Sequence, residues 1–191
     1  VEEGTAGWNP FSFRLCFLQR EPKKEREALT PQQQAALLEF MEQDTYCRRY
    51  RDLFLILLHT GLRSGECAGL TVEDIHLHSG YLQVDHQVYY SPEQGGMVWA
   101  PPKTEKSCRK IPLTAPAAEA LQRRILVARQ FGRCQVIGQR RHFLFPCLNG
   151  SRPLHGVDFD RIFRNVHRRY AQSGGIPIAA LTPHILRHTF C

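Results

Sequence analysis

The chain has 191 residues, 42% of them hydrophobic and 23% charged, which is typical of one globular domain. Its longest uninterrupted apolar run, Leu53 to Leu58, is too short to cross a membrane. Residues 1–20 lack the ordered regions of a signal peptide, so we expect a cytoplasmic protein. The seven cysteines include no CxxC pair, which disfavours a zinc ribbon or a disulfide scaffold and favours reduced thiols.

The charge is unevenly distributed along the chain. The net charge is +7, yet residues 1–100 hold 9 Lys and Arg against 14 Asp and Glu. Residues 101–191 hold 16 Lys and Arg against 4 Asp and Glu. This asymmetry indicates a polyanionic partner, with nucleic acid as the first candidate. A basic surface that serves only solubility is the other interpretation, and charge alone does not choose between them.

Most of the chain has the signals of helices. Thr30, Pro31 and Gln33 predict a helix start with a capping box. The segment 48–60 is apolar on all sides and predicts a buried central helix that ends at Gly61. Further helices are predicted over 117–131, over 157–171 and from Thr182 onward.

The helix over 157–171 has one apolar face and one face that carries Arg161, Arg164 and Arg168. Such a stripe is usually a solvated face, but it can also contact a DNA backbone.

A strand-like pattern interrupts the helices between residues 80 and 113. Alternating apolar residues predict strands over 81–89, 97–100 and 109–113, joined by a turn at 91–96 and a polar loop at 101–107. We interpret these as a three-stranded antiparallel meander. The predicted fold is therefore α+β and mainly α-helical, with a small three-stranded antiparallel sheet on one side of a helical domain.

Three separated places hold polar residues that the apolar pattern does not need. Arg63 directly follows the buried helix, where a salt bridge to Glu66 or Asp74 is the simplest explanation. Lys103 lies in the polar loop, where a lysine is most often plain solvated charge. On a helix, His184, Arg187 and His188 share one face.

These residue types suit phosphoryl transfer. Two guanidinium groups can bind the non-bridging oxygens of a phosphodiester, and a lysine or histidine can protonate the leaving oxygen. Such a site needs no metal, and the sequence offers no carboxylate cluster that would hold magnesium. A zinc site on His184 and His188 is the alternative, but the glutamate of the metalloprotease motif is missing.

Three motifs in order carry a resemblance to a known family. They are HTGLRSGE at 59–66, PKT at 102–104 with Ser107, Arg109 and IPL at 111–113, and LTPHILRHTF at 181–190. Over roughly residues 27–191 the chain resembles the catalytic domain of the tyrosine recombinase (phage integrase) family. Within that family, integrases of conjugative transposons and temperate phages are the most similar group.

The resemblance implies a role for each matching residue. Arg63 and Arg187 would bind the scissile phosphate, Lys103 would be the general acid, and His184 would assist proton transfer. Glu66 would support the first arginine, and His188 would have a packing or a catalytic role. Basic residues beside these positions are candidates for contacts with DNA phosphates, namely Lys106, Arg109, Arg161, Arg164 and Arg168. No metal or other cofactor is implied.

The family's nucleophile is a tyrosine that follows the His-x-x-Arg motif, and this sequence ends at Cys191. The resemblance also implies that residues 1–28 are a linker from a missing DNA-clamping domain. We expect residues 29–191 to be a catalytic domain truncated before its nucleophile, and so inactive and monomeric by itself.

The resemblance implies site-specific recombination of a mobile element in the bacterial cytoplasm, at the nucleoid. Strand cleavage and rejoining would pass through a 3′-phosphotyrosyl intermediate, with double-stranded DNA as partner and a tetramer of the full-length protein on paired sites. A non-catalytic DNA-binding regulatory module of the same fold is the alternative.

Overall fold

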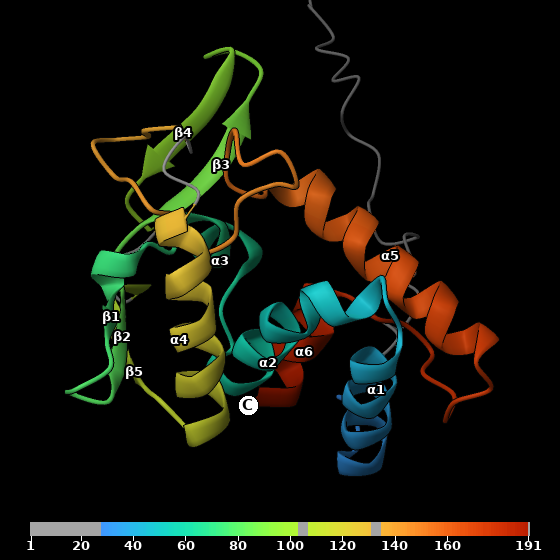
Figure 1. Cartoon of the computed structure of the whole chain (residues 1–191). Helices are drawn as coiled ribbons and strands as arrows, with labels where there is room; N and C mark the ends of the chain where they lie inside the picture. The colour runs from blue at the N-terminus through green and yellow to red at the C-terminus, as the bar shows by residue number, and fades with distance from the viewer. Residues whose placement is uncertain (1–27, 103–106, 131–134, 191) are drawn as a thin grey trace, which may run out of the picture.

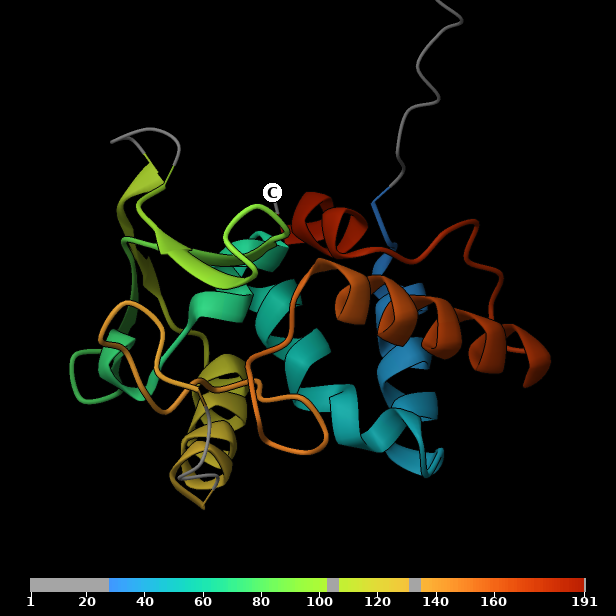
Figure 2. The ribbon, with the colours of Figure 1, turned by 90° about the horizontal axis from the view of Figure 1, so that it is seen from above.

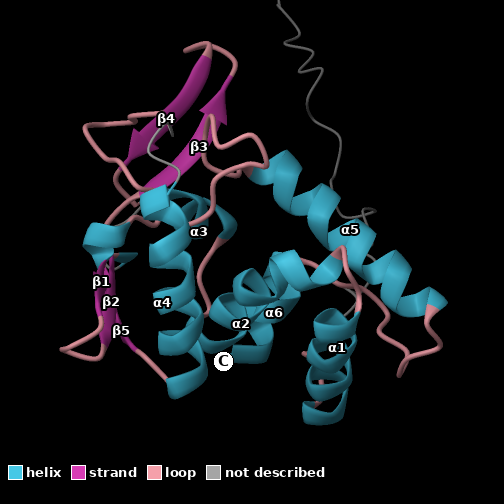
Figure 3. Ribbon diagram, viewed as in Figure 1, coloured by secondary structure: helices cyan, strands magenta, loops and turns pink. Residues whose placement is uncertain are grey.

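A computed structural model describes residues 28–102, 107–130 and 135–190. Helices form most of it, and the strands lie on one side, as Figure 3 shows. This confirms the predicted α+β class. The elements in chain order are α1 (Pro31–Gln43), η2 (Cys47–Tyr50), α2 (Arg51–Thr60), α3 (Ser64–Gly69), η3 (Val72–Asp74), β1 (Ile75–His76), β2 (Tyr81–Val84), β3 (Gln87–Ser91), β4 (Gly96–Ala100), β5 (Arg109–Pro112), α4 (Ala115–Gln130), α5 (Gly156–Gln172) and α6 (Pro183–Phe190) (Figure 1).

The first helix begins as its sequence predicts. The Thr30 hydroxyl accepts a hydrogen bond from the Gln33 backbone N–H at 3.2 Å, and the Gln33 side chain accepts one from the Thr30 N–H at 2.9 Å. This capping box satisfies two backbone donors that the helix itself leaves without partners. At the other end of α1, the Asp44 carboxylate accepts hydrogen bonds from Arg169 of α5, which ties the two helices together.

Helix α2 is the centre of the domain. Six consecutive apolar side chains, from Leu53 to Leu58, are buried, which confirms the predicted central helix. Helices α4 and α6 pack against it, and Phe54 stacks on Phe163 of α5 with ring centroids 4.3 Å apart. Figure 2 shows α2 enclosed between these elements. The helix ends at Gly61, whose φ of +58° suits glycine.

The strands depart from the predicted meander. A three-stranded antiparallel sheet is present, but its order is β1-β2-β5, while β3 and β4 form a separate hairpin. The continuous strand expected over 81–89 is broken at Asp85 and His86. The buried His86 ring contacts the Gly69 carbonyl oxygen at 2.8 Å, so the chain leaves the sheet here and docks on α3. Strand β3 then packs against α3.

Helix α5 is amphipathic, as predicted. Its apolar side chains, among them Phe159, Phe163 and Val166, are buried in the core, and its three predicted surface arginines are exposed. Burial of one continuous stripe, rather than intrinsic helix propensity, stabilises such a helix. Among the helices of the described residues, none has both the length and the apolar character needed to cross a membrane.

The Phe54–Phe163 stack gives a test of this core. Phe163→Ala is expected to lower the free energy of unfolding by about 3–5 kcal/mol, because it removes a buried ring and leaves a cavity. Chemical denaturation measures the change. Leu126→Ala is the matched control, since Leu126 is 59% exposed, and its effect should stay within about 0.5 kcal/mol. Equal losses in the two variants would contradict this packing.

Candidate functional site

Two of the predicted site residues, Arg63 and Arg187, meet at the buried carboxylate of Glu66. Glu66 lies in the short helix α3, and only 5% of it is exposed. Its Oε2 accepts a hydrogen bond from the Arg63 backbone N–H at 2.9 Å, and its Oε1 accepts one from Arg63 Nη1 at 2.8 Å. The salt bridge that the sequence suggested for Arg63 is therefore made to Glu66. Asp74, the other candidate partner, instead accepts hydrogen bonds from Thr71 and Arg140.

A second arginine binds the same carboxylate from the sheet. Arg109 of β5 donates from Nη1 to Glu66 Oε1 at 3.0 Å and from Nη2 to Oε2 at 2.8 Å. This is the forked geometry in which guanidinium and carboxylate match best. Sequence reasoning placed Arg109 among candidate DNA contacts. The structure places its guanidinium on Glu66, with 26% of the side chain exposed.

Arg187 reaches the same place from α6. Its Nη1 lies 4.0 Å from Glu66 Oε2, and it donates a hydrogen bond to the Gly61 carbonyl oxygen at the end of α2. The Arg63 side chain is 54% exposed and that of Arg187 is 28% exposed. Two arginines that are far apart in the sequence thus converge on one carboxylate, with part of each side chain facing solvent.

The arginines keep Glu66 ionised. Burial alone would raise the pKa of its carboxyl group, but hydrogen bonds from Arg109 and from Arg63 outweigh burial and lower the pKa to about 2. Glu66 is therefore a carboxylate across the physiological range. The cluster of Glu66, Arg63, Arg109 and Arg187 combines one negative charge with three positive charges, so its net charge favours an anion nearby.

Two histidines lie beside Arg187 on α6. Nε2 of His184 and Nε2 of His188 are 3.1 Å apart, and both residues are exposed. His184 also lines a groove of about 540 Å³ between α5 and α6, together with Ser64, which follows Arg63. His184 is thus exposed, on the same helix as Arg187 and in a groove that also contains the neighbour of Arg63.

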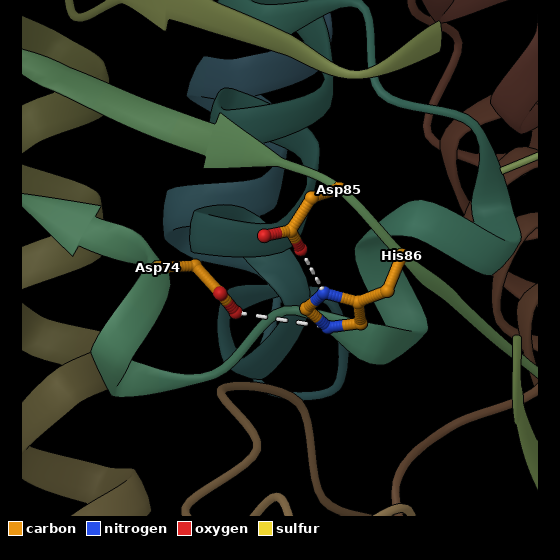
Figure 4. A group of neighbouring side chains, drawn as sticks. All are labelled: Asp74, Asp85 and His86. Atoms are coloured by element: carbon orange, nitrogen blue, oxygen red, sulfur yellow. Dashed lines mark hydrogen bonds and ion pairs between the residues drawn. The ribbon is translucent and has the colours of Figure 1, made fainter. Parts of the chain in front are cut away.

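Another cluster has the residue types of a metal site. Atoms of Asp74, Asp85 and His86 lie within 4.8 Å of one another, and within the described ranges this is the only such group of three or more metal-ligating side chains. Figure 4 shows the imidazole between the two carboxylates. Its Nδ1 is 2.5 Å from Asp85, and its Nε2 is 2.8 Å from the Gly69 carbonyl oxygen. Both ring nitrogens are engaged, so the cluster connects α3 to the strand break.

The remaining predicted residues fall into two groups. Lys103 and Lys106 precede β5 in the sequence and lie outside the described residues. Arg161, Arg164 and Arg168 are exposed on α5, and Arg161 pairs with the buried Asp158 at 2.8 Å.

Sequence reasoning did not find two of the contacts. The alternation of β5 could have indicated that Arg109 and the buried Ile111 face the same side. No sequence signal points to the Gly61 carbonyl as a partner for Arg187.

Comparison with known proteins shows which family the chain resembles. The chain is 33% identical over its whole length to the transposase from transposon Tn916 of Enterococcus faecalis, and covers 46% of that protein. It is 29% identical to the tyrosine recombinase XerD of Proteus mirabilis, over 74% of this chain and 37% of that protein. The chain therefore spans about half the length, or less, of these curated relatives.

A solved structure is similar over most of the chain. The structure of the Tn1549 transposon integrase in complex with circular intermediate DNA superimposes with a TM-score of 0.84 at 33% identity. The match covers 96% of this chain and 59% of that one. A family model described as the phage integrase family matches residues 27–191. The chain belongs to the phage integrase family, the tyrosine recombinases.

Proposed function

We propose that this chain is the phosphate-binding part of a recombinase catalytic domain that integrates or excises a mobile DNA element. The observation that carries the proposal is the convergence of Arg63 and Arg187 on the Glu66 carboxylate, from two separate helices. A phosphodiester accumulates negative charge on its non-bridging oxygens during in-line attack. Two guanidiniums held in place beforehand stabilise that charge without reorganising.

The proposed reaction is strand cleavage by a tyrosine. Its hydroxyl attacks the scissile phosphorus, a 3′-phosphotyrosyl bond forms, and the 5′ oxygen leaves. Lys103 protonates the leaving oxygen and His184 assists proton transfer. Because the arginines supply the positive charge that a metal ion can supply in phosphoryl transfer, the proposed mechanism uses no metal or other cofactor.

The nucleophile belongs to the part of the protein that follows Arg187. Tyr46, Tyr50, Tyr81, Tyr89, Tyr90 and Tyr170 all precede the His-x-x-Arg motif. We therefore propose that residues 29–191 are the greater part of a catalytic domain and that residues 1–28 connect it to a DNA-clamping domain. A tyrosine encoded after Cys191 completes the site.

Double-stranded DNA is the proposed partner. The similar Tn1549 integrase structure is a complex with circular intermediate DNA. We propose a full-length tetramer on paired sites in the bacterial cytoplasm, and a monomer for these 191 residues. His188 has a supporting role through its contact with His184.

A DNA-binding module without catalysis is the second interpretation of this fold. It accounts for the basic half of the chain, but it gives no reason for a buried carboxylate that orients two arginines. The cluster around Glu66 therefore favours the enzyme.

Arg63→Ala and Arg187→Ala, each in the full-length protein, are expected to lower covalent DNA cleavage about 100-fold to 1,000-fold. Each variant removes one guanidinium from the transition state while most of the protein's bonds to DNA remain. Single-turnover cleavage of a nicked suicide substrate measures the rate. Arg123→Ala is the control, because Arg123 pairs with Asp52 between α4 and α2, away from the cluster. Wild-type cleavage by both Arg63→Ala and Arg187→Ala would refute the assignment.

The arginine stripe of α5 makes a separate prediction for DNA binding by the 191-residue chain. If Arg164 and Arg168 bind phosphates, the double variant Arg164→Gln/Arg168→Gln weakens binding. The slope of log K against log salt concentration then falls by roughly 0.9 for each phosphate that an arginine no longer neutralises. Fluorescence anisotropy across a salt series measures the slope. The control Arg123→Gln/Arg129→Gln removes the same charge from α4. Matching slopes in the two double variants would show that the stripe is only a solvated face.

A further inference from the structure

Arg109 is a basic residue whose guanidinium does not extend from the surface toward a DNA backbone. It lies on β5, at the point where this strand pairs with the end of β2, and its forked contact with Glu66 joins the sheet to α3. Nη1 also donates to the Ser107 carbonyl oxygen at 3.1 Å, which fixes the direction of the guanidinium plane. Arg109 is thus held from two sides.

Four hydrogen bonds from the described residues reach Glu66, and they match the number of acceptor positions on its carboxylate. An ionised carboxylate has about four lone-pair positions. Oε1 accepts from Arg63 Nη1 and Arg109 Nη1, and Oε2 accepts from the Arg63 backbone N–H and Arg109 Nη2. Arg187 Nη1 stays at 4.0 Å from Oε2, a distance of an ion pair rather than a hydrogen bond. Arg109 therefore occupies lone-pair positions on the Glu66 oxygens that would otherwise be open to Arg187.

The contact between Arg109 and Glu66 also changes the net charge of the cluster. A buried carboxylate beside two phosphate-binding arginines offsets one of their two positive charges. With Arg109 forked onto that carboxylate, the cluster again holds two more positive charges than negative ones. The phosphate then meets a stronger positive potential in a partly desolvated site, where each charge has a larger effect than in water.

We infer that Arg109 is a positioning residue of the recombinase: it saturates and neutralises Glu66, and so keeps Arg63 and Arg187 directed at the scissile phosphate. It acts through Glu66 and does not touch the reacting atoms. The inference rests on the proposed function, because it concerns the same phosphate site.

Removing Arg109 has a consequence that depends on pH. Among the described residues, the charged groups that face Glu66 are Arg63 on its own helix, Arg109 on β5 and Arg187 on α6. Burial disfavours the charged carboxylate, and Arg109 is the foremost of the hydrogen-bonding groups that oppose this effect. Without Arg109 the pKa of Glu66 rises. Protonation as the pH falls then takes away the acceptor that orients Arg63.

The test compares Arg109→Gln and Arg109→Lys with Arg63→Ala and the control Arg123→Gln, all in the full-length protein. Single-turnover cleavage at saturating protein is measured from pH 5 to pH 8, and DNA affinity is measured by anisotropy. We expect cleavage by Arg109→Gln to fall about tenfold near pH 8, equivalent to one charge-assisted hydrogen bond. We expect a further fall toward pH 5 that neither the wild type nor Arg123→Gln shows.

Arg109→Lys keeps the charge but removes the fork, so it should fold normally and cleave at an intermediate rate. It keeps the inference testable if Arg109→Gln does not fold. DNA affinity should change less than twofold to threefold in both variants, because Arg109 binds Glu66 rather than phosphate.

Three results would overturn the inference. One is wild-type cleavage at every pH by both Arg109 variants while Arg63→Ala is inactive, which leaves the proposed function intact. Another is a loss of DNA affinity as large as the loss of cleavage, with no change in the pH profile, which would make Arg109 a phosphate-binding residue. The third is wild-type cleavage by Arg63→Ala, which would overturn the proposed function as well.

Discussion

The burial of one negative charge determines how this domain is built around its site. A carboxylate as deeply buried as that of Glu66 is strongly destabilising unless positive groups surround it, and these come from the start of its own helix and from two segments that are distant in the sequence. Arg63 comes from the start of α3, Arg109 from β5 and Arg187 from α6. The arginines in turn need Glu66, because three clustered guanidiniums would otherwise repel one another. The packing of these three segments is therefore what places the arginine cluster.

Helix α2 determines where the arginine cluster lies in the domain. Its apolar side chains are buried on every face, so its position in the core is not adjustable. Gly61 ends it in the left-handed conformation and presents its carbonyl oxygen to Arg187. A Cβ at Gly61 would lie 2.5 Å from the Phe190 ring, so α6 can approach this closely only over a glycine. The rigid core is thus joined directly to the arginine on α6.

The sequence predicts the parts of this fold that depend on local pattern. The capping box of α1, the all-apolar α2 and the amphipathic α5 each follow from residues close together in the chain. The sheet does not, because the break at Asp85 and His86 depends on a distant acceptor, the Gly69 carbonyl oxygen. Likewise, Arg63, Glu66 and Arg187 were identified by motif, whereas the attachment of Arg109 to Glu66 depends on a sheet register that local pattern does not specify.

Net charge and site chemistry have different origins in this chain. The basic half makes the domain attractive to a polyanion, but Arg63 and Glu66 both lie in residues 1–100, which are acidic overall. What makes the site positive is the pairing of one buried carboxylate with three arginines, two of them from the basic half. Under the proposed function, long-range attraction would bring DNA to the surface and would be weakened by salt, because the charges involved are exposed. Within the cluster only the Glu66 carboxylate is shielded from salt by burial, and the partly exposed Arg63 and Arg187 side chains that it orients would be the groups that hold a phosphate under the proposed function.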